Sequence, residues 1–134
     1  IILLSQLTKL VLSHTFLNGT ILSNIASLPS LQSVDTSNSL FSGSIPSNIA
    51  DMTVLTSLRI SHSSITGSLP NIGSLTSLQL LSVSNTGLTG TIPTSIGLLN
   101  KLFQFEASNT LLLGELPSSI GELSKLVIFY LVSV

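Results

Sequence analysis

The side chains that could do chemistry in this chain are few and far apart. The chain has four Lys and Arg, five Asp and Glu and two His, and it has no cysteine for a thiolate zinc site. His14 and His62 occupy equivalent places in a sequence repeat that is described below, two repeats apart. Two strand spacings would separate them by about 10 Å, which is too far for both to bind one zinc ion. Asp35 and Arg59 favour an exposed ion pair, because no nucleophile or pocket accompanies them. The sequence therefore predicts no catalytic residue, no metal site and no cofactor.

Composition excludes two further classes of function. Charged residues make up 7% of the 134 residues and the formal net charge is −1, whereas a nucleic-acid binder needs clustered basic side chains. The basic residues are instead scattered along the chain, at Lys9, Arg59, Lys101 and Lys125. Hydrophobic residues make up 43%, yet no uncharged apolar run reaches the roughly 20 residues of a membrane span. We therefore predict no nucleic-acid partner and no membrane span in this segment.

A short repeat places all of these side chains. A glycine followed by any residue, then Ile or Leu, then usually Pro, recurs five times at intervals of 24, 24, 23 and 24 residues. The glycines are Gly19, Gly43, Gly67, Gly90 and Gly114. Upstream of each glycine, mostly apolar residues stand at positions 1, 4, 6 and 11 of the repeat, and a hydroxyl residue stands at position 9. In one copy positions 1, 4, 6, 9 and 11 are Leu78, Leu81, Val83, Thr86 and Leu88.

This spacing predicts a coiled chain. Positions 4 and 6 point to the same side of a short strand, and equivalent strands would pair about 4.8 Å apart into a parallel sheet. After the glycine, apolar residues three apart, such as Ile96, Leu99 and Leu102, indicate a 3-10-like or extended return segment. The 23-residue copy loses one residue just after Pro70, which leaves the strands in register. An all-β sandwich is the alternative, but it would need longer alternating runs and hairpin turns.

The pattern L-x-x-L-x-L-x-x-(N/T/S)-x-L-x-G-x-I-P resembles the plant-type leucine-rich repeat. The likeness is clearest in residues 31–46 and 78–93 and covers essentially the whole chain. It implies an α/β-type repeat solenoid, a right-handed coil with a parallel β-sheet on the concave face and 3-10 or extended return segments on the convex face. Residues 1–134 would be one solenoid segment of about five to six repeats. The family includes ectodomains of receptor kinases and receptor-like proteins, and secreted polygalacturonase-inhibiting proteins.

Position 9 departs from the family pattern. The family usually places Asn there, whereas this chain has hydroxyl residues: Thr15, Ser39, Ser63, Thr86 and Thr110. A hydroxyl donates one hydrogen bond where an amide donates two. We expect Thr86 and Thr110 to be buried and to bond backbone groups in their place.

The ends of the chain depart from the family as well. The cysteine-bearing caps of secreted members are absent, and the sequence begins and ends within a repeat, with Val134 at position 9. Solenoids need polar caps to stay soluble, and residues 126–134 are as apolar as an internal strand. The uncapped strand predicts self-association through the ends.

The outward positions of the strands supply the candidate binding residues. In the family, ligands usually dock on the concave face, which positions 3, 5 and 8 would line. The candidates are Asp35, Arg59, His62, Ser82, Asn85, Gln104 and Glu106. Their character changes from copy to copy, whereas the core positions repeat Leu, Ile or Val; a plain solvated surface is the alternative for each. Position 7 is serine in the five copies that contain the repeat glycine. We interpret these hydroxyls as bonding the turn backbone and not as binding a glycan.

One modification motif is present. Asn18-Gly19-Thr20 is the sole N-x-S/T triplet and lies in a turn, so Asn18 is the predicted glycosylation acceptor if the protein is secreted.

The resemblance and the composition together predict a non-catalytic, extracellular or cell-surface recognition module. Its partner would be a protein, peptide or glycan ligand. The alternative is a structural or adhesive repeat protein of a wall, sheath or filament, which the low charge and the Ser- and Thr-rich surface also suit.

Overall fold

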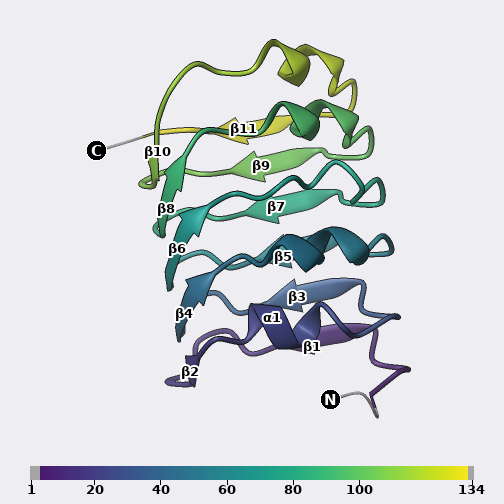
Figure 1. Ribbon diagram of the computed structural model, residues 1–134, viewed down its shortest axis with the longest axis vertical. Coiled ribbons are helices and arrows are strands. Elements are labelled where there is room, and N and C mark those ends of the chain that lie inside the picture. The colour runs from purple at the N-terminus through teal and green to yellow at the C-terminus, as the bar shows by residue number, and fades with distance from the viewer. Residues whose placement is uncertain (1–3, 133–134) are drawn as a thin grey trace.

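One short strand from each coil joins the larger of two parallel sheets. The computed structural model describes residues 4–132, and Figure 1 shows the coils stacked one upon another from the N-terminal to the C-terminal end. The six strands follow the order β1-β3-β5-β7-β9-β11. They are β1 Lys9–Val11, β3 Ser33–Asp35, β5 Ser57–Arg59, β7 Leu80–Ser82, β9 Gln104–Glu106 and β11 Ile128–Tyr130. The parallel sheet predicted from positions 3 to 5 of the repeat is confirmed.

The register of this sheet follows the repeat. Each strand residue pairs with the residue at the same position of the next coil, as Lys9 does with Ser33. The pairing holds across the 23-residue copy, where Ser57 lies opposite Leu80. The predicted loss of one residue outside the strand ladder is therefore confirmed.

A second parallel sheet lies beside the first, and the repeat pattern did not reveal it. Each of its five strands contains or precedes one of the repeat glycines. The strands follow one another along one side of the stack of coils (Figure 1). They are β2 Asn18–Gly19, β4 Leu40–Ser44, β6 Ser64–Ser68, β8 Gly87–Gly90 and β10 Leu111–Leu112. The register is shifted by two residues relative to the repeat, so Asn18 lies opposite Leu40 and not opposite its equivalent, Ser42.

The return segments are mostly 3-10 helices, as predicted. They are η1 Ser47–Asp51, η2 Thr94–Leu98 and η3 Ser118–Glu122, and each begins directly after a proline in extended conformation. The return that follows Pro70 has no helix. That difference follows from the missing residue, because Asn71 alone separates Pro70 from the buried Ile72.

The first return segment corrects the prediction, because it forms one turn of α-helix, α1 Leu22–Ile25. Leu22 stands where the other coils have proline. A proline disfavours the α region for the residue before it. Without one, Ile21 takes helical angles (φ −81°, ψ −33°), and its carbonyl accepts a bond from the N–H of Ile25 at 3.2 Å. The helix therefore starts one residue earlier and closes with α-type bonds.

The core is a column of apolar side chains enclosed by each coil. Position 1 is fully buried in four successive coils, at Leu31, Leu55, Leu78 and Leu102. Phe105 and Phe129, on adjacent strands, place their ring centroids 5.5 Å apart. Stacking neighbouring coils buries this column, as the physics of repeat proteins requires.

The position-9 hydroxyls bond as expected. Each donates to the carbonyl three residues before it in the same coil, for example Thr86 to Val83 at 2.7 Å and Thr110 to Ala107 at 2.9 Å. The same bond is made by Thr15, Ser39 and Ser63. Thr86 is buried, whereas Thr110 is half-buried, so the expectation of burial is confirmed fully for Thr86 only.

Two buried hydroxyls within residues 4–132 have no hydrogen-bond partner, those of Thr36 and Ser95. Thr36 is at core position 6, where the following coils have Ile60 and Val83. Ser95 is on η2 and is equivalent to Ser119, whose hydroxyl donates to the carbonyl of Thr94 in the coil before it.

Ser95 lies next to the short coil. Thr94, the acceptor for Ser119, directly follows a proline, and the matching residue one coil before Ser95 is Asn71, which follows Pro70. That coil is one residue short at this point, and the Ser95 hydroxyl is buried beside it without a partner.

No helix among residues 4–132 has the length and apolar character that a membrane span requires.

Candidate functional site

The outer face of the six-stranded sheet carries the candidate residues in one column. Position 5 of each coil lies beside position 5 of the next, so Asp35, Arg59, Ser82 and Glu106 are neighbours on four successive strands. Gln104 is on the same strand as Glu106, and two residues apart on a strand means the same side of the sheet. The structure thus brings together five of the seven predicted residues. We call this column and Gln104 the sheet-face site.

Glu106 is held in place by a chain of hydrogen bonds. Its Oε2 accepts a bond from the Ser82 hydroxyl at 2.6 Å, and its Oε1 accepts one from Gln104 Nε2 at 2.8 Å. Because Ser82 has already donated its proton, the Ser61 hydroxyl donates to Ser82, at an Oγ–Oγ distance of 2.7 Å. Both carboxylate oxygens are therefore oriented before any ligand arrives.

Ser82 supports the site from beneath its surface. Only 7% of Ser82 is exposed, and its neighbour Leu80, also on the outer face, is buried as well. Its hydroxyl is used within the protein, so Ser82 positions Glu106 and offers little surface of its own. The sequence pattern had placed Ser82 with the ligand contacts.

Asp35 and Arg59 are adjacent in the sheet but do not form the expected ion pair. Among residues 4–132, no two oppositely charged side chains lie within 4.0 Å of each other. Asp35 instead accepts a hydrogen bond from the N–H of Ser37 at 3.0 Å, which turns its carboxylate toward its own backbone. Arg59 is exposed, so its guanidinium is the accessible positive group of the site.

The other two candidates, His62 and Asn85, lie just beyond the strands in a strained turn. All five residues at position 8 have positive φ, between 52° and 57°: His14, Asn38, His62, Asn85 and Asn109. Asn and His are among the few residues that adopt this left-handed conformation readily. The backbone conformation therefore determines which residue types occupy position 8. The sequence alone did not show this, because the side chain at position 8 changes from coil to coil.

Side chains at position 8 also bond one another. Asn85 Nδ2 lies 3.3 Å from His62 Nε2, and Asn109 Nδ2 donates to Asn85 Oδ1 at 3.2 Å. An amide N–H can only donate, so this contact requires an unprotonated Nε2 on His62. The result is a polar ladder along the rim of the sheet-face site.

Two members of the serine column at position 7, Ser84 and Ser108, bond the turn backbone as we interpreted. Ser84 Oγ accepts a bond from the N–H of Ser108 at 3.0 Å, and Ser108 Oγ accepts one from the N–H of Val132 at 3.2 Å. These bonds tie the turn of one coil to the turn of the next. The hydroxyls are thereby used within the protein.

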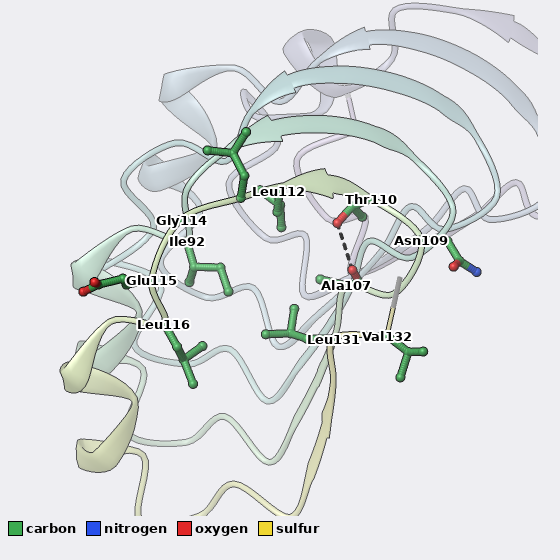
Figure 2. Close-up of a pocket in the computed structure, with 11 residues that line it drawn as sticks. Ile92, Ala107, Asn109, Thr110, Leu112, Gly114, Glu115, Leu116, Leu131 and Val132 are labelled. Atoms are coloured by element: carbon green, nitrogen blue, oxygen red, sulfur yellow. Dashed lines mark hydrogen bonds between the residues drawn. The ribbon is translucent and has the colours of Figure 1, made fainter. Parts of the chain in front are cut away.

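A hollow of about 200 Å³ lies next to the C-terminal end of the site (Figure 2). In Figure 2 the side chains of Ile92, Leu116 and Leu131 surround it, while Glu115 and Asn109 point away. Its walls are largely core positions of the repeat, and no charged group points into it. We therefore assign this hollow to packing between coils and not to ligand binding.

A family model described as Leucine Rich Repeat matches residues 77–99, which hold the clearest copy of the pattern. The chain is built of leucine-rich repeats. No curated protein matches it by sequence.

Solved structures of plant receptor ectodomains have the same fold. A TDR receptor is 33% identical to the leucine-rich-repeat chain over 96% of it, with a TM-score of 0.92. The plant peptide hormone receptor RGFR1, solved in complex with RGF2, is 33% identical over 92% of the chain, with a TM-score of 0.85. The ectodomain of the receptor kinase SOBIR1 from Arabidopsis thaliana is 28% identical over 94%, with a TM-score of 0.86.

The leucine-rich-repeat chain is shorter than these relatives. It covers 20% of the RGFR1 chain and 22% of the TDR receptor, and 69% of the SOBIR1 ectodomain. The predicted solenoid, with a parallel sheet on one face and 3-10 turns on the other, is confirmed by these matches.

Proposed function

We propose that this chain is a non-catalytic recognition module of the cell exterior, and that its ligand, a protein, peptide or glycan, binds the sheet-face site. An extended peptide is the ligand that we favour. Two similar receptors were solved in complex with their partners: the plant peptide hormone receptor RGFR1 with RGF2, and the receptor kinase HAESA with the peptide hormone IDA. The likeness to such ectodomains, which catalyse no reaction themselves, also supports a binding role over an enzymatic one.

One observation carries the proposal, the preorganised carboxylate of Glu106 in a column that also holds Arg59. Asp35, Arg59 and Glu106 are three of only nine formally charged side chains in the chain, and they lie in one column across four successive strands of one sheet, with Ser82 between Arg59 and Glu106. Rigid strands and two fixed hydrogen bonds reduce the entropy lost when a ligand binds. Opposite charges a few strands apart suit a ligand that presents both signs along its length, as a peptide does.

Selection from a random peptide library displayed on phage, with the 134-residue chain as bait, would supply the probe. We expect selected peptides to bind about tenfold more weakly to Arg59→Ala or Glu106→Gln. A tenfold change in Kd corresponds to the binding free energy of a single good charged contact. Asp51→Asn is the matched control, since it removes an exposed charge from η1 on the opposite side of the coil.

Peptides that bind Arg59→Ala and Glu106→Gln as tightly as the parent chain, but lose affinity with Asp51→Asn, would move the site to the return segments. Enrichment of no peptide at all would contradict the peptide-binding proposal and leave glycan arrays as the next probe.

A structural or adhesive role is the second candidate, which the low charge and the Ser- and Thr-rich surface suit. Several apolar side chains in the first and last coils are at least half exposed. They are Leu4 and Val11 at one end and Val127, Tyr130 and Val132 at the other. Exposed apolar groups next to edge strands β1 and β11 invite a second copy to pair with them. We propose self-association through these ends, which a rise in mass with concentration in light scattering would support.

A further inference from the structure

An aromatic ring stands almost free in solvent on the first coil. Phe16 is 91% exposed, more than any other large apolar side chain among residues 4–132. Beside it Leu40, from the next coil, is 52% exposed. Leu40 begins β4 of the smaller sheet, and Phe16 lies two residues before β2 of the same sheet.

Asn18 neighbours both residues, one along the chain and one across the sheet. Phe16 precedes it by two residues and is exposed, just before β2 begins. Leu40 is its Cα partner across the β2–β4 pair, and directly paired residues share a face of the sheet. Asn18, Gly19 and Thr20 are all exposed, so the whole N-x-T triplet is accessible.

We propose that Asn18 carries an N-linked glycan whose first N-acetylglucosamine packs on the Phe16 ring and on Leu40. The proposal rests on the extracellular location in the proposed function. It identifies a modification site and also the surface that receives the sugar.

The modification is a glycosyl transfer from a lipid-linked oligosaccharide diphosphate, supplied by the secretory pathway. The bond between C1 of the sugar and the diphosphate oxygen breaks, and the lipid diphosphate leaves with that electron pair. A bond forms between C1 and Nδ2 of Asn18, and one amide proton is released. Thr20 supplies the hydroxyl that defines the acceptor triplet.

The first sugar and the ring are chemically suited to each other. One face of a pyranose presents C–H groups, and the face of an aromatic ring carries negative charge density that attracts such positively polarised hydrogens. Covering Phe16 and Leu40 also removes apolar area from water. No charged group is required, which suits a flank that carries none at these positions.

The chain contains its own control at Thr89. Thr89-Gly90-Thr91 is equivalent to Asn18-Gly19-Thr20, and both threonines are exposed. Thr89 also lies opposite an exposed leucine, Leu111, on the neighbouring strand. Gly87 stands two residues before it, in the place of Phe16. Thr89→Asn therefore recreates the triplet and its leucine but not the ring.

The test is secretion of the 134-residue chain from a eukaryotic host behind a cleavable leader, so that its native destination does not matter. Occupancy is read by mass spectrometry after enzymatic deglycosylation in water labelled with heavy oxygen, which marks each formerly glycosylated Asn as a labelled Asp. It is read at Asn18 and, in a Thr20→Ala background, at Thr89→Asn. Melting midpoints are then compared for glycosylated chains and for the unglycosylated Thr20→Ala chain, each with Phe16 and with Phe16→Ala. Because the ring is exposed, Phe16→Ala should not alter the midpoint of the unglycosylated chain.

We expect Asn18 to be occupied and its glycan to raise the melting midpoint by about 2–5 °C with Phe16 and by less than half of that with Phe16→Ala. The glycan on Thr89→Asn should give no such rise. An unoccupied Asn18, or an equal rise with and without the ring, would overturn the inference. Peptide selection on the same secreted material tests the proposed function separately, because either result can fail while the other stands.

Discussion

Thr36 is the residue whose substitution tests the packing of the coils most directly. It is 1% exposed, and its hydroxyl has no hydrogen-bond partner among the described residues. Its equivalents in the next two coils, Ile60 and Val83, are fully buried apolar side chains. A valine of nearly the same shape at position 36 would therefore match the rest of the column.

The magnitude follows from two contributions. A buried polar group without a partner costs about 1–3 kcal/mol, and replacing it by an apolar group of the same shape removes that cost. The methyl that takes the place of the hydroxyl adds at most about 0.8 kcal/mol of burial. Allowing for imperfect fit, we expect Thr36→Val to stabilise the chain by about 1–2 kcal/mol. For a chain of this size that raises the melting midpoint by about 3–8 °C.

Thr86→Val is the matched control, since it makes the same chemical change at a hydroxyl that is used. Thr86 is also buried, but its hydroxyl donates to the carbonyl of Val83 at 2.7 Å. Losing that bond should cost about 1 kcal/mol. Urea unfolding followed by circular dichroism would measure both variants, with an unchanged m-value showing that stability alone has changed. Shifts of the same sign for the two variants would refute the reasoning.

Three further results are expected. Gly97→Ala should destabilise the chain by about 2 kcal/mol or more, because the new Cβ would lie 2.6 Å from the backbone oxygen of Ser119. Gly121→Ala, at the matching place on η3, meets nothing within 4 Å and should be neutral or stabilising. Urea titrations of the two variants would measure this difference in stability. Asn38→Ala should cost about 1 kcal/mol and Asn38→Gly almost nothing, because φ there is 54°; equal losses would contradict a backbone origin. Replacing Val127 by Lys should reduce the apparent mass in light scattering at high concentration, and an unchanged mass would argue against association through the end coils.

The sequence was sufficient for the parts of the fold that repeat. Apolar positions such as Leu31 and Leu55 recur at constant spacing, so the strands, their parallel pairing and the register across the short copy follow from periodicity. The α-turn at Leu22 could also have been read from the proline that is missing there.

The remaining features depend on geometry that a repeat pattern does not contain. The smaller sheet pairs residues two positions out of phase, so Asn18 meets Leu40, and no alignment of equivalent positions would bring them together. The contacts of Glu106 depend on the side-chain conformations of Ser82 and Gln104. A signal for the left-handed turn was present, because position 8 holds only His and Asn in the five copies that contain the repeat glycine, but we interpreted the variation as a sign of recognition.

The unbonded hydroxyl of Ser95 has a mechanical consequence. On the side of the return segments, Ser74 donates to the carbonyl of Ala50 and Ser119 to that of Thr94, which ties each of these segments to the one before it. At Ser95 this tie is missing, because its hydroxyl has no hydrogen-bond partner. Pulling a solenoid along its axis loads the boundaries between its coils in series, and a boundary held by fewer bonds resists less. The boundary between the short coil and the next has one return-side bond fewer than the boundaries on either side of it, and we expect it to part before they do.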